Sequence, residues 1–182
     1  MNTTTTSRTY AIDPAHTTVE FVVRHLMITK VRGRFTSVSG TIAVPDDATV
    51  PTSVDVEIDA KTIDTREEQR DNHLRSEDFL HTEQHPKLTF KSTSIDGDGD
   101  DFKVHGDLMI HGVTRKVTLD ATFEGRVKDP WGGERIGYSA STKINRKDFG
   151  LTWNVLLESG GLTVGEDVRI ELNVEAVAQP AG

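Results

Sequence analysis

The stretch that decides the fold reads Lys116-Val117-Thr118-Leu119-Asp120-Ala121-Thr122-Phe123-Glu124-Gly125-Arg126-Val127. From Val117 to Phe123, apolar side chains occupy every second position and polar side chains stand between them. Successive side chains of a β-strand point to opposite faces of the sheet, so this alternation indicates a strand with one apolar and one solvated face. The segment is therefore predicted to be a long strand that is buried on one side only.

The same alternation recurs along most of the chain and predicts about eight strands. The other rows cover residues 19–25, 38–44, 54–60, 88–90, 102–110, 136–144 and 168–174. Short links with turn-forming residues, such as 96–101 and 129–133, favour antiparallel neighbours. Around residues 66–80 the chain is instead rich in charged residues and helix formers, and there we predict a short helical insertion.

Eight antiparallel strands with one apolar face form either a sandwich or a closed barrel. Long strands favour the barrel, because closure removes exposed strand edges. An eight-stranded barrel is either filled by its own side chains or wide enough for one small ligand. The chain has seven phenylalanines, two tyrosines and two tryptophans, which are few large side chains to fill the interior of a barrel with so many strands. This supply favours a cavity, and a filled barrel that serves as an interaction module stays open as an alternative.

The composition argues against several functional classes. With 182 residues, we expect a single domain over 1–182, with a flexible tail at 1–7. Twenty-one basic and 29 acidic residues give a formal net charge of −8, which argues against nucleic-acid binding. The chain has no cysteine, which excludes disulfides, thiolate metal sites and a cysteine nucleophile. Its apolar runs are too short for a secretory signal or a membrane span, so the sequence predicts a cytoplasmic protein.

The histidines raise the question of a metal site. His81 and His85 have the i, i+4 spacing that places two imidazoles on one face of a helix. Pro86 follows directly and disfavours helical geometry at His85, so the sequence predicts no metal site. His105 and His111 fall in phase with polar residues on the expected outer face and are interpreted as solvated strand residues.

The acidic run at 96–101 begins like a calcium-binding loop. Asp101 stands where such a loop needs glycine and Asp107 where it needs glutamate, so an acidic hairpin turn is predicted instead. The sequence shows no nucleophile elbow and no phosphate-binding glycine motif, which favours a non-catalytic binding protein. A small barrel enzyme acting on a lipid or isoprenoid is the alternative. His25 continues the inward row of the strand at 19–25, as either a core histidine or a ligand contact.

Ordered motifs along nearly the whole chain carry a family resemblance. They include Ile12-Asp13-Pro14-Ala15-His16, Val31-x-Gly33-x-Phe35, Arg70-Asp71-x-His73-Leu74, His85-Pro86-Lys87-Leu88-Thr89-Phe90, Asn145-Arg146-Lys147-Asp148-Phe149-Gly150-Leu151 and Val164-Gly165-Glu166. In this order and spacing, the chain resembles the YceI-like family, known as polyisoprenoid-binding, lipocalin-like proteins. The resemblance implies an antiparallel barrel with a long apolar pore for a polyisoprenoid or similar amphiphile, and a homodimer.

The inward rows and the family motifs together predict the ligand contacts. The expected contact residues are Phe21, Val23, His25, Val56, Ile58, His73, Leu74, Phe79, Phe90, Leu108, Leu119, Phe123, Tyr138 and Phe149. A polar head group is expected near the basic residues Lys30, Arg32, Arg34 and Arg70. Because only a long buried chain outweighs the cost of association, polyprenyl, quinone or long acyl lipids are favoured over short metabolites, and no cofactor is expected.

Overall fold

A computed structural model describes residues 5–158 and 161–180 of the chain. Within these residues the chain forms eleven strands, one α-helix and three short 3-10 helices. The strands are β1 (Ser7–Ile12), β2 (Thr18–His25), β3 (Thr29–Phe35), β4 (Val38–Pro45), β5 (Ser53–Asp59), β6 (Ile63–Asp64), β7 (Lys87–Asp96), β8 (Asp101–Ile110), β9 (Val113–Lys128), β10 (Glu134–Asn145) and β11 (Val164–Ala178). The helices are α1 (Glu68–Arg75), η1 (Pro14–His16), η2 (Ala60–Thr62) and η3 (Arg146–Phe149).

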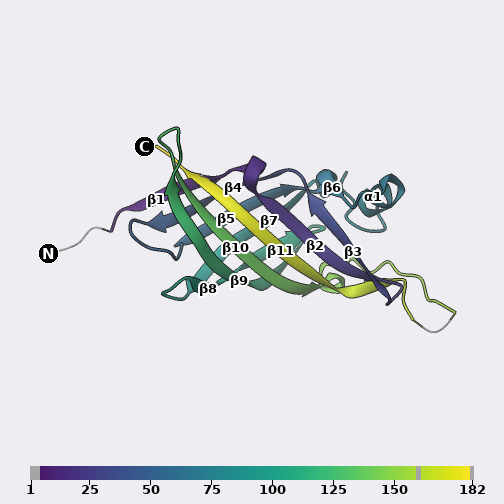
Figure 1. The fold of residues 1–182 in the computed structure, drawn as a ribbon. Coiled ribbons are helices and arrows are strands. Elements are labelled where there is room, and N and C mark those ends of the chain that lie inside the picture. The colour runs from purple at the N-terminus through teal and green to yellow at the C-terminus, as the bar shows by residue number, and fades with distance from the viewer. Residues whose placement is uncertain (1–4, 159–160, 181–182) are drawn as a thin grey trace.

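Eight of the strands close into an antiparallel barrel, which confirms the predicted fold class. The ring runs β1-β4-β5-β7-β8-β9-β10-β11, and β11 pairs back onto β1 with Ile12 opposite Ala176. Figure 1 shows the long strands β9, β10 and β11 wrapping obliquely around this ring. The ring differs from the predicted set of eight strands in one member. The predicted row at 19–25 forms β2, which lies outside the ring, and β1 takes its place.

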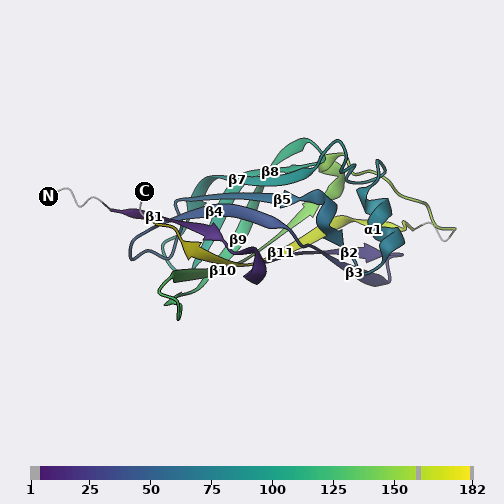
Figure 2. The same ribbon diagram turned by 90° about the horizontal axis from the view of Figure 1, so that it is seen from above.

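The fifteen residues of β11 explain this difference, because the strand is long enough to serve two partners. Its C-terminal part pairs with β1, and its N-terminal part pairs with β2. β1 and β2 therefore follow one another along the same edge of β11, separated by η1. β3 then pairs with β2, and β6 with β3, so the wall extends beyond the closed ring at one end. Helix α1 lies at this end, opposite the start of β1 and the end of β11 (Figures 1 and 2).

Helix α1 lies inside the predicted insertion and is shorter than it. Glu67 caps its first turn, and the side chain accepts hydrogen bonds from the backbone N–H groups of Gln69 and Arg70. The helix ends at Arg75, and residues 77–80 continue as turns. Among the described residues, no helix combines the length and apolar character that crossing a lipid bilayer requires.

Two sequence expectations at the edges of the barrel have clear outcomes. The acidic run joins β7 to β8 as a hairpin connection, with Asp96 ending one strand and Asp101 beginning the next. Residues 1–4 of the expected tail lie outside the described residues. Ser7, which was also placed in that tail, instead begins β1 and lies opposite Pro45 of β4.

The apolar side chains form two clusters, one toward each end of the barrel. The first contains Tyr10, Val44 and Ile136, each 2% exposed or less, at the β1 end of the barrel. The second surrounds Phe149, which is 1% exposed, and Leu88 near α1. The inward-facing side chains between these clusters are less completely buried, because they line a cavity.

Candidate functional site

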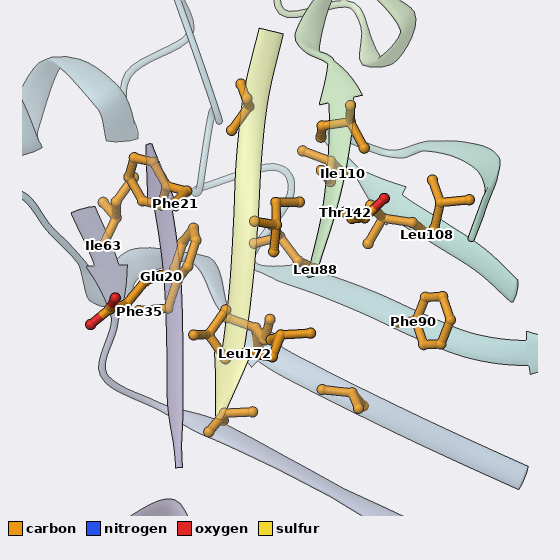
Figure 3. Close-up of a pocket in the computed structure, with 18 of the residues that line it drawn as sticks. Glu20, Phe21, Phe35, Ile63, Leu88, Phe90, Leu108, Ile110, Thr142 and Leu172 are labelled. Atoms are coloured by element: carbon orange, nitrogen blue, oxygen red, sulfur yellow. The ribbon is translucent and has the colours of Figure 1, made fainter. Parts of the chain in front are cut away.

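An apolar cavity of about 470 Å³ occupies the interior of the barrel. Side chains from nearly every strand of the sheet line it, and Figure 3 shows Phe21, Phe35, Ile63, Leu88, Phe90, Leu108, Ile110 and Leu172 converging on the space. Val56 and Leu119 point inward and are nonetheless only half-buried. A filled barrel would bury these side chains, so the interior is hollow. The volume falls within the range of roughly 300–1,000 Å³ that is typical of small-molecule sites.

One end of the cavity is closed by aromatic packing. Tyr138 lines the cavity, and its hydroxyl donates a 2.7 Å hydrogen bond to the carbonyl of Thr49. Phe102 packs edge-on against Tyr138 with ring centroids 5.7 Å apart. Burial raises the pKa of Tyr138 well above its usual value of 10.0, so the group stays neutral. This closed end can therefore accept only an apolar part of a ligand.

The end near α1 carries polar side chains instead. Arg70 lines the cavity and donates from Nε to Thr65 Oγ1 at 2.8 Å and from Nη2 to the Thr65 carbonyl at 2.7 Å. Thr65 is itself fixed, because Oδ1 of the buried Asp71 accepts hydrogen bonds from its backbone N–H and from its hydroxyl. The position of the Arg70 guanidinium is thus set by a buried network rather than by solvent.

Three aromatic rings cover part of this polar end. The rings of His73 and Trp153 meet edge-on with centroids 4.7 Å apart, and Phe79 lies 5.0 Å from His73 and 5.2 Å from Trp153. All three residues line the cavity. Asp78 fixes the imidazole of His73 through a 2.9 Å contact to Nε2. The rings join α1 to the segment before β11, so they form a cover made of two chain segments.

A buried arginine holds the second of these segments in place. Arg146 is 3% exposed and donates to the carbonyls of Leu151, Trp153 and Gly165 at 2.7–2.9 Å, and to Val164 at 3.3 Å. Burial lowers the pKa of its guanidinium, and nearby Glu166 partly opposes that effect. The arginine ties both ends of 151–165 to η3 and leaves a positive charge in the cavity wall.

Most of the predicted contact residues lie in the cavity wall. They are Phe21, Val23, His25, Val56, Ile58, His73, Leu74, Phe79, Phe90, Leu108, Leu119 and Tyr138, together with Arg70 from the head-group set. The cavity therefore brings together side chains from β2, β5, β7, β8, β9, β10 and the helical insertion. Their contact with a ligand stays a prediction.

Two predicted contact residues lie outside the wall. Phe149 is buried in the second apolar cluster, behind side chains such as Leu88 that do face the cavity. Phe123 packs against Tyr138 at the closed end, with ring centroids 5.8 Å apart. Both positions satisfy the apolar pattern, but apolar patterning does not separate a side chain that borders a cavity from one packed behind it.

Three of the four predicted head-group residues also lie away from the cavity. Lys30, Arg32 and Arg34 are exposed on the outer face of β3, where Arg34 pairs with Asp64 at 3.1 Å. The inward positions of this strand are Val31 and Phe35, in accordance with the two-residue period.

Sequence reasoning missed other parts of the wall. Trp153 and Arg146 both line the cavity. Trp153 lies in a segment without strand or helix periodicity, so no pattern pointed to it. Arg146 belongs to the same family motif as the predicted Phe149, but Lys147 and Asp148 follow it directly, so no pattern distinguished it from solvated charged residues.

The comparisons with known proteins agree with this geometry. The YceI-like domain model matches residues 10–176. The chain belongs to the YceI-like family. Protein YceI of Escherichia coli is 40% identical over 172 residues, covering 93% of this chain and 87% of that protein.

Two solved structures extend the likeness to the fold of the family. The YceI protein of Campylobacter jejuni superposes with a TM-score of 0.73 at 31% identity, covering 86% of this chain and 90% of that one. A polyisoprenoid binding domain from Saccharophagus degradans superposes with a TM-score of 0.70 at 18% identity, covering 93% and 98% of the two chains. The second match concerns the fold alone.

Proposed function

We propose that this YceI-like protein is a non-catalytic carrier that holds one long-chain isoprenoid, or a similar amphiphilic lipid, inside its barrel. The observation that carries the proposal is the apolar cavity of about 470 Å³, closed at the Tyr138 end and polar at the Arg70 end. This gradient matches a molecule with a long hydrocarbon tail and one polar head. The name of the Saccharophagus degradans domain, which shares the fold, supports the isoprenoid class.

Burial of the tail supplies the affinity. Each buried methylene contributes about 0.8 kcal/mol, so ten carbons give about 8 kcal/mol before costs. Association costs at least about 4 kcal/mol, which leaves a ten-carbon ligand near the millimolar range. Doubling the tail adds up to about 8 kcal/mol and allows micromolar binding or better after ordering losses. The cavity is therefore suited to long tails rather than to short metabolites.

The head group is assigned to the end near α1. Arg70 engages Nε and Nη2 with Thr65, so within the described residues Nη1 keeps its donors for a ligand. His73 and His25 line the same end of the cavity. Because Arg70 is oriented before the ligand arrives, little side-chain entropy is lost when it donates to a phosphate, hydroxyl or quinone oxygen. The cytoplasmic location and the homodimer expected from the sequence stay predictions.

Native mass spectrometry of the purified protein tests the proposal, with added geranylgeraniol as the probe. The protein should retain a lipid or take up one geranylgeraniol per chain. Ala140→Trp should abolish uptake, because Ala140 lines the cavity and an indole fills the space. Ser141→Trp is the matched control, since the next residue along β10 points to the other face. Empty protein that ignores the probe, or equal uptake by both variants, would overturn the proposal.

A further inference from the structure

Three histidines from two separate turns meet outside the cavity. His81 and His85 belong to the connection between α1 and β7, and His111 lies in the turn between β8 and β9. The rings of His85 and His111 have centroids 4.8 Å apart, and those of His81 and His85 are 6.0 Å apart. One ring nitrogen from each residue lies within 4.8 Å of the other two, and all three residues are half-buried. The interpretation of His111 as a solvated strand residue was therefore wrong.

The backbone fixes the first two ligands of this cluster. The N–H of His85 donates to the carbonyl of His81 at 2.9 Å, which closes one helical turn just before Pro86. The proline prevents the turn from continuing as a helix, but it does not prevent this single turn. The i, i+4 spacing therefore brings the two imidazoles together without a helix.

The third histidine is placed by a tight hairpin. His111 and Gly112 both have positive φ, of 57° and 70°, as the two central residues of a type I′ turn require. The His85 ring lies directly on this turn, because a Cβ on Gly112 would come within 2.8 Å of its Cε1. The glycine therefore permits both the turn and the close approach of the imidazole.

Hydrogen bonding and burial prepare the rings for a cation. Nδ1 of His111 lies 3.3 Å from the carbonyl of Phe149. A carbonyl can only accept, so Nδ1 carries the proton and Nε2 keeps its lone pair. A backbone carbonyl in this role orients many metal-binding histidines. All three rings are half-buried, so a cation held among them is partly shielded from water.

We propose that His81, His85 and His111 form a binding site for a divalent transition metal ion of the zinc class. Imidazole is a preferred ligand of zinc, nickel and copper. Tetrahedral zinc with bonds of 2.0–2.1 Å separates its ligand atoms by about 3.3 Å, so nitrogens that lie within 4.8 Å of one another need to close by at most about 1.5 Å. Three protein ligands leave the fourth position to water. The ion would join the helical insertion to the β8–β9 turn.

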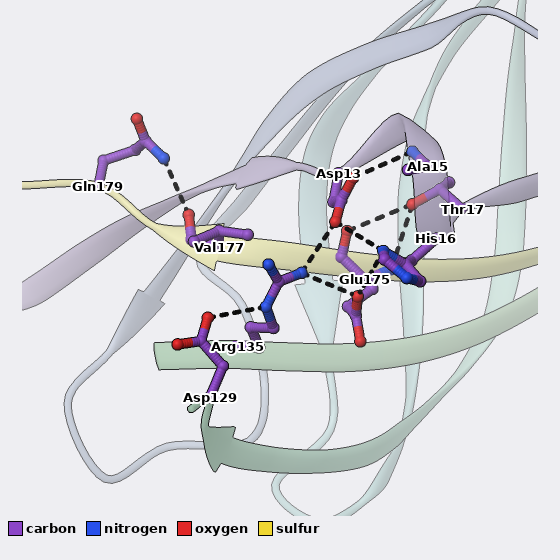
Figure 4. Close-up of polar contacts among 9 residues, drawn as sticks. All are labelled: Asp13, Ala15, His16, Thr17, Asp129, Arg135, Glu175, Val177 and Gln179. Carbon is purple, nitrogen blue, oxygen red and sulfur yellow. Dashed lines mark hydrogen bonds and ion pairs between the residues drawn. The ribbon is translucent and has the colours of Figure 1, made fainter. Parts of the chain in front are cut away.

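A second group of possible ligands serves as a contrast. Asp13, His16 and Glu175 also place their ligand atoms within 4.8 Å of one another. Arg135 already stands among them, with Nη1 donating to Asp13 at 2.8 Å and to Glu175 at 3.0 Å (Figure 4). That guanidinium pairs with both carboxylates, so this group is an ion-pair network. The described residues place no such cation among the three imidazoles of the first cluster.

Cobalt titration of the full chain tests the site. The protein is prepared without a polyhistidine tag and stripped with a chelator, and Co²⁺ binding is followed by its visible absorption. One Co²⁺ should bind per chain, with displacement by Zn²⁺ and a rise in the melting temperature. His111→Asn should weaken binding by at least about 100-fold. Asn is a preferred residue at this position of a type I′ turn, so the variant removes the imidazole and keeps the hairpin.

His105→Asn is the matched control. His105 lies on β8, where it contacts Asp96 and Thr118 rather than the cluster, and its loss should leave cobalt binding unchanged. His81→Asn provides a second test, because Asn also tolerates the φ of 48° found at His81. Metal-free melting curves establish that each variant is folded. Absence of stoichiometric binding, or equal affinity in the wild type and both cluster variants, would overturn the site.

Discussion

The ring of Phe21 lies over the backbone of Gly33, its direct partner across the β2–β3 pair. A Cβ on Gly33 would come within 2.7 Å of Cε1 and 2.8 Å of Cε2 of that ring. Phe21 also packs against Phe35, with centroids 5.7 Å apart, and both rings line the cavity. The glycine therefore determines how close to the wall the Phe21 ring can lie, and so how wide the cavity is.

Gly33→Ala should narrow the cavity without unfolding the barrel. The new methyl displaces the far end of a flexible side chain into the cavity. Each ligand methylene that no longer fits inside the cavity lowers the binding free energy by about 0.8 kcal/mol, or the affinity by about fourfold. Competition between geranylgeraniol and a fluorescent fatty acid measures the loss. Gly99→Ala is the control, because nothing lies within 4 Å of its Cβ position. Equal affinity in both variants would show that Phe21 does not limit the ligand.

Affinity should rise with isoprenoid length and then level off. Each further five-carbon unit adds burial until the tail reaches the closed end at Tyr138 and Phe102, after which extra units remain in water. Isothermal titration of the C10, C15, C20 and C30 alcohols measures the trend. A length-independent affinity would contradict tail burial as the source of binding.

Arg146→Met should destabilise the protein and loosen the segment before β11. The substitution leaves the carbonyls of Leu151, Trp153 and Gly165 without their donor in a buried place, and we expect a loss of about 3 kcal/mol in the free energy of unfolding. Urea unfolding measures the loss, and faster amide exchange in 151–158 locates it. Arg169→Met, at an exposed site on β11, should change stability little.

The barrel was predictable because one-sided strands carry a two-residue period. The period holds along β10 and from Val117 to Phe123 of β9, and these strands lie where the sequence placed them. A register shift after Phe123 interrupts it, which leaves Val127 61% exposed. β1 has only Tyr10 and Ile12 on its apolar face, which is too short a row to tell from a tail. The two-partner role of β11 depends on pairing between distant segments, which local patterning does not encode.

The site was predictable where it follows the strands and not where it depends on loops. Phe90 and Leu108 were found because inward alternation marks them. Trp153 was missed because Arg146 positions its segment through backbone carbonyls. The three-histidine cluster was missed because His111 and His85 are brought together by tertiary packing of two turns 26 positions apart.

The Asp13 carboxylate should make the free energy of unfolding depend on pH in the acidic range. His16 and Arg135 hydrogen-bond to it and lower its pKa from 3.8 to about 2. A carboxyl group whose pKa is lower in the folded state stabilises that state above its unfolded pKa. The stabilisation is lost as pH falls from about 4 through 2. The side chain is 17% exposed, so after solvent screening we expect about 1 kcal/mol.

Asp13→Asn isolates this contribution. At pH 7 the variant should unfold at lower urea concentration than the wild type, and the two curves should converge as pH approaches 2. Asn keeps an oxygen that can accept from the N–H of Ala15, so the start of η1 is preserved. Asp167→Asn is the control, since that carboxylate is 66% exposed and lies 3.8 Å from Lys143. A difference between wild type and Asp13→Asn that stays constant from pH 7 to 2.5 would mean that the ionised carboxylate does not stabilise the fold.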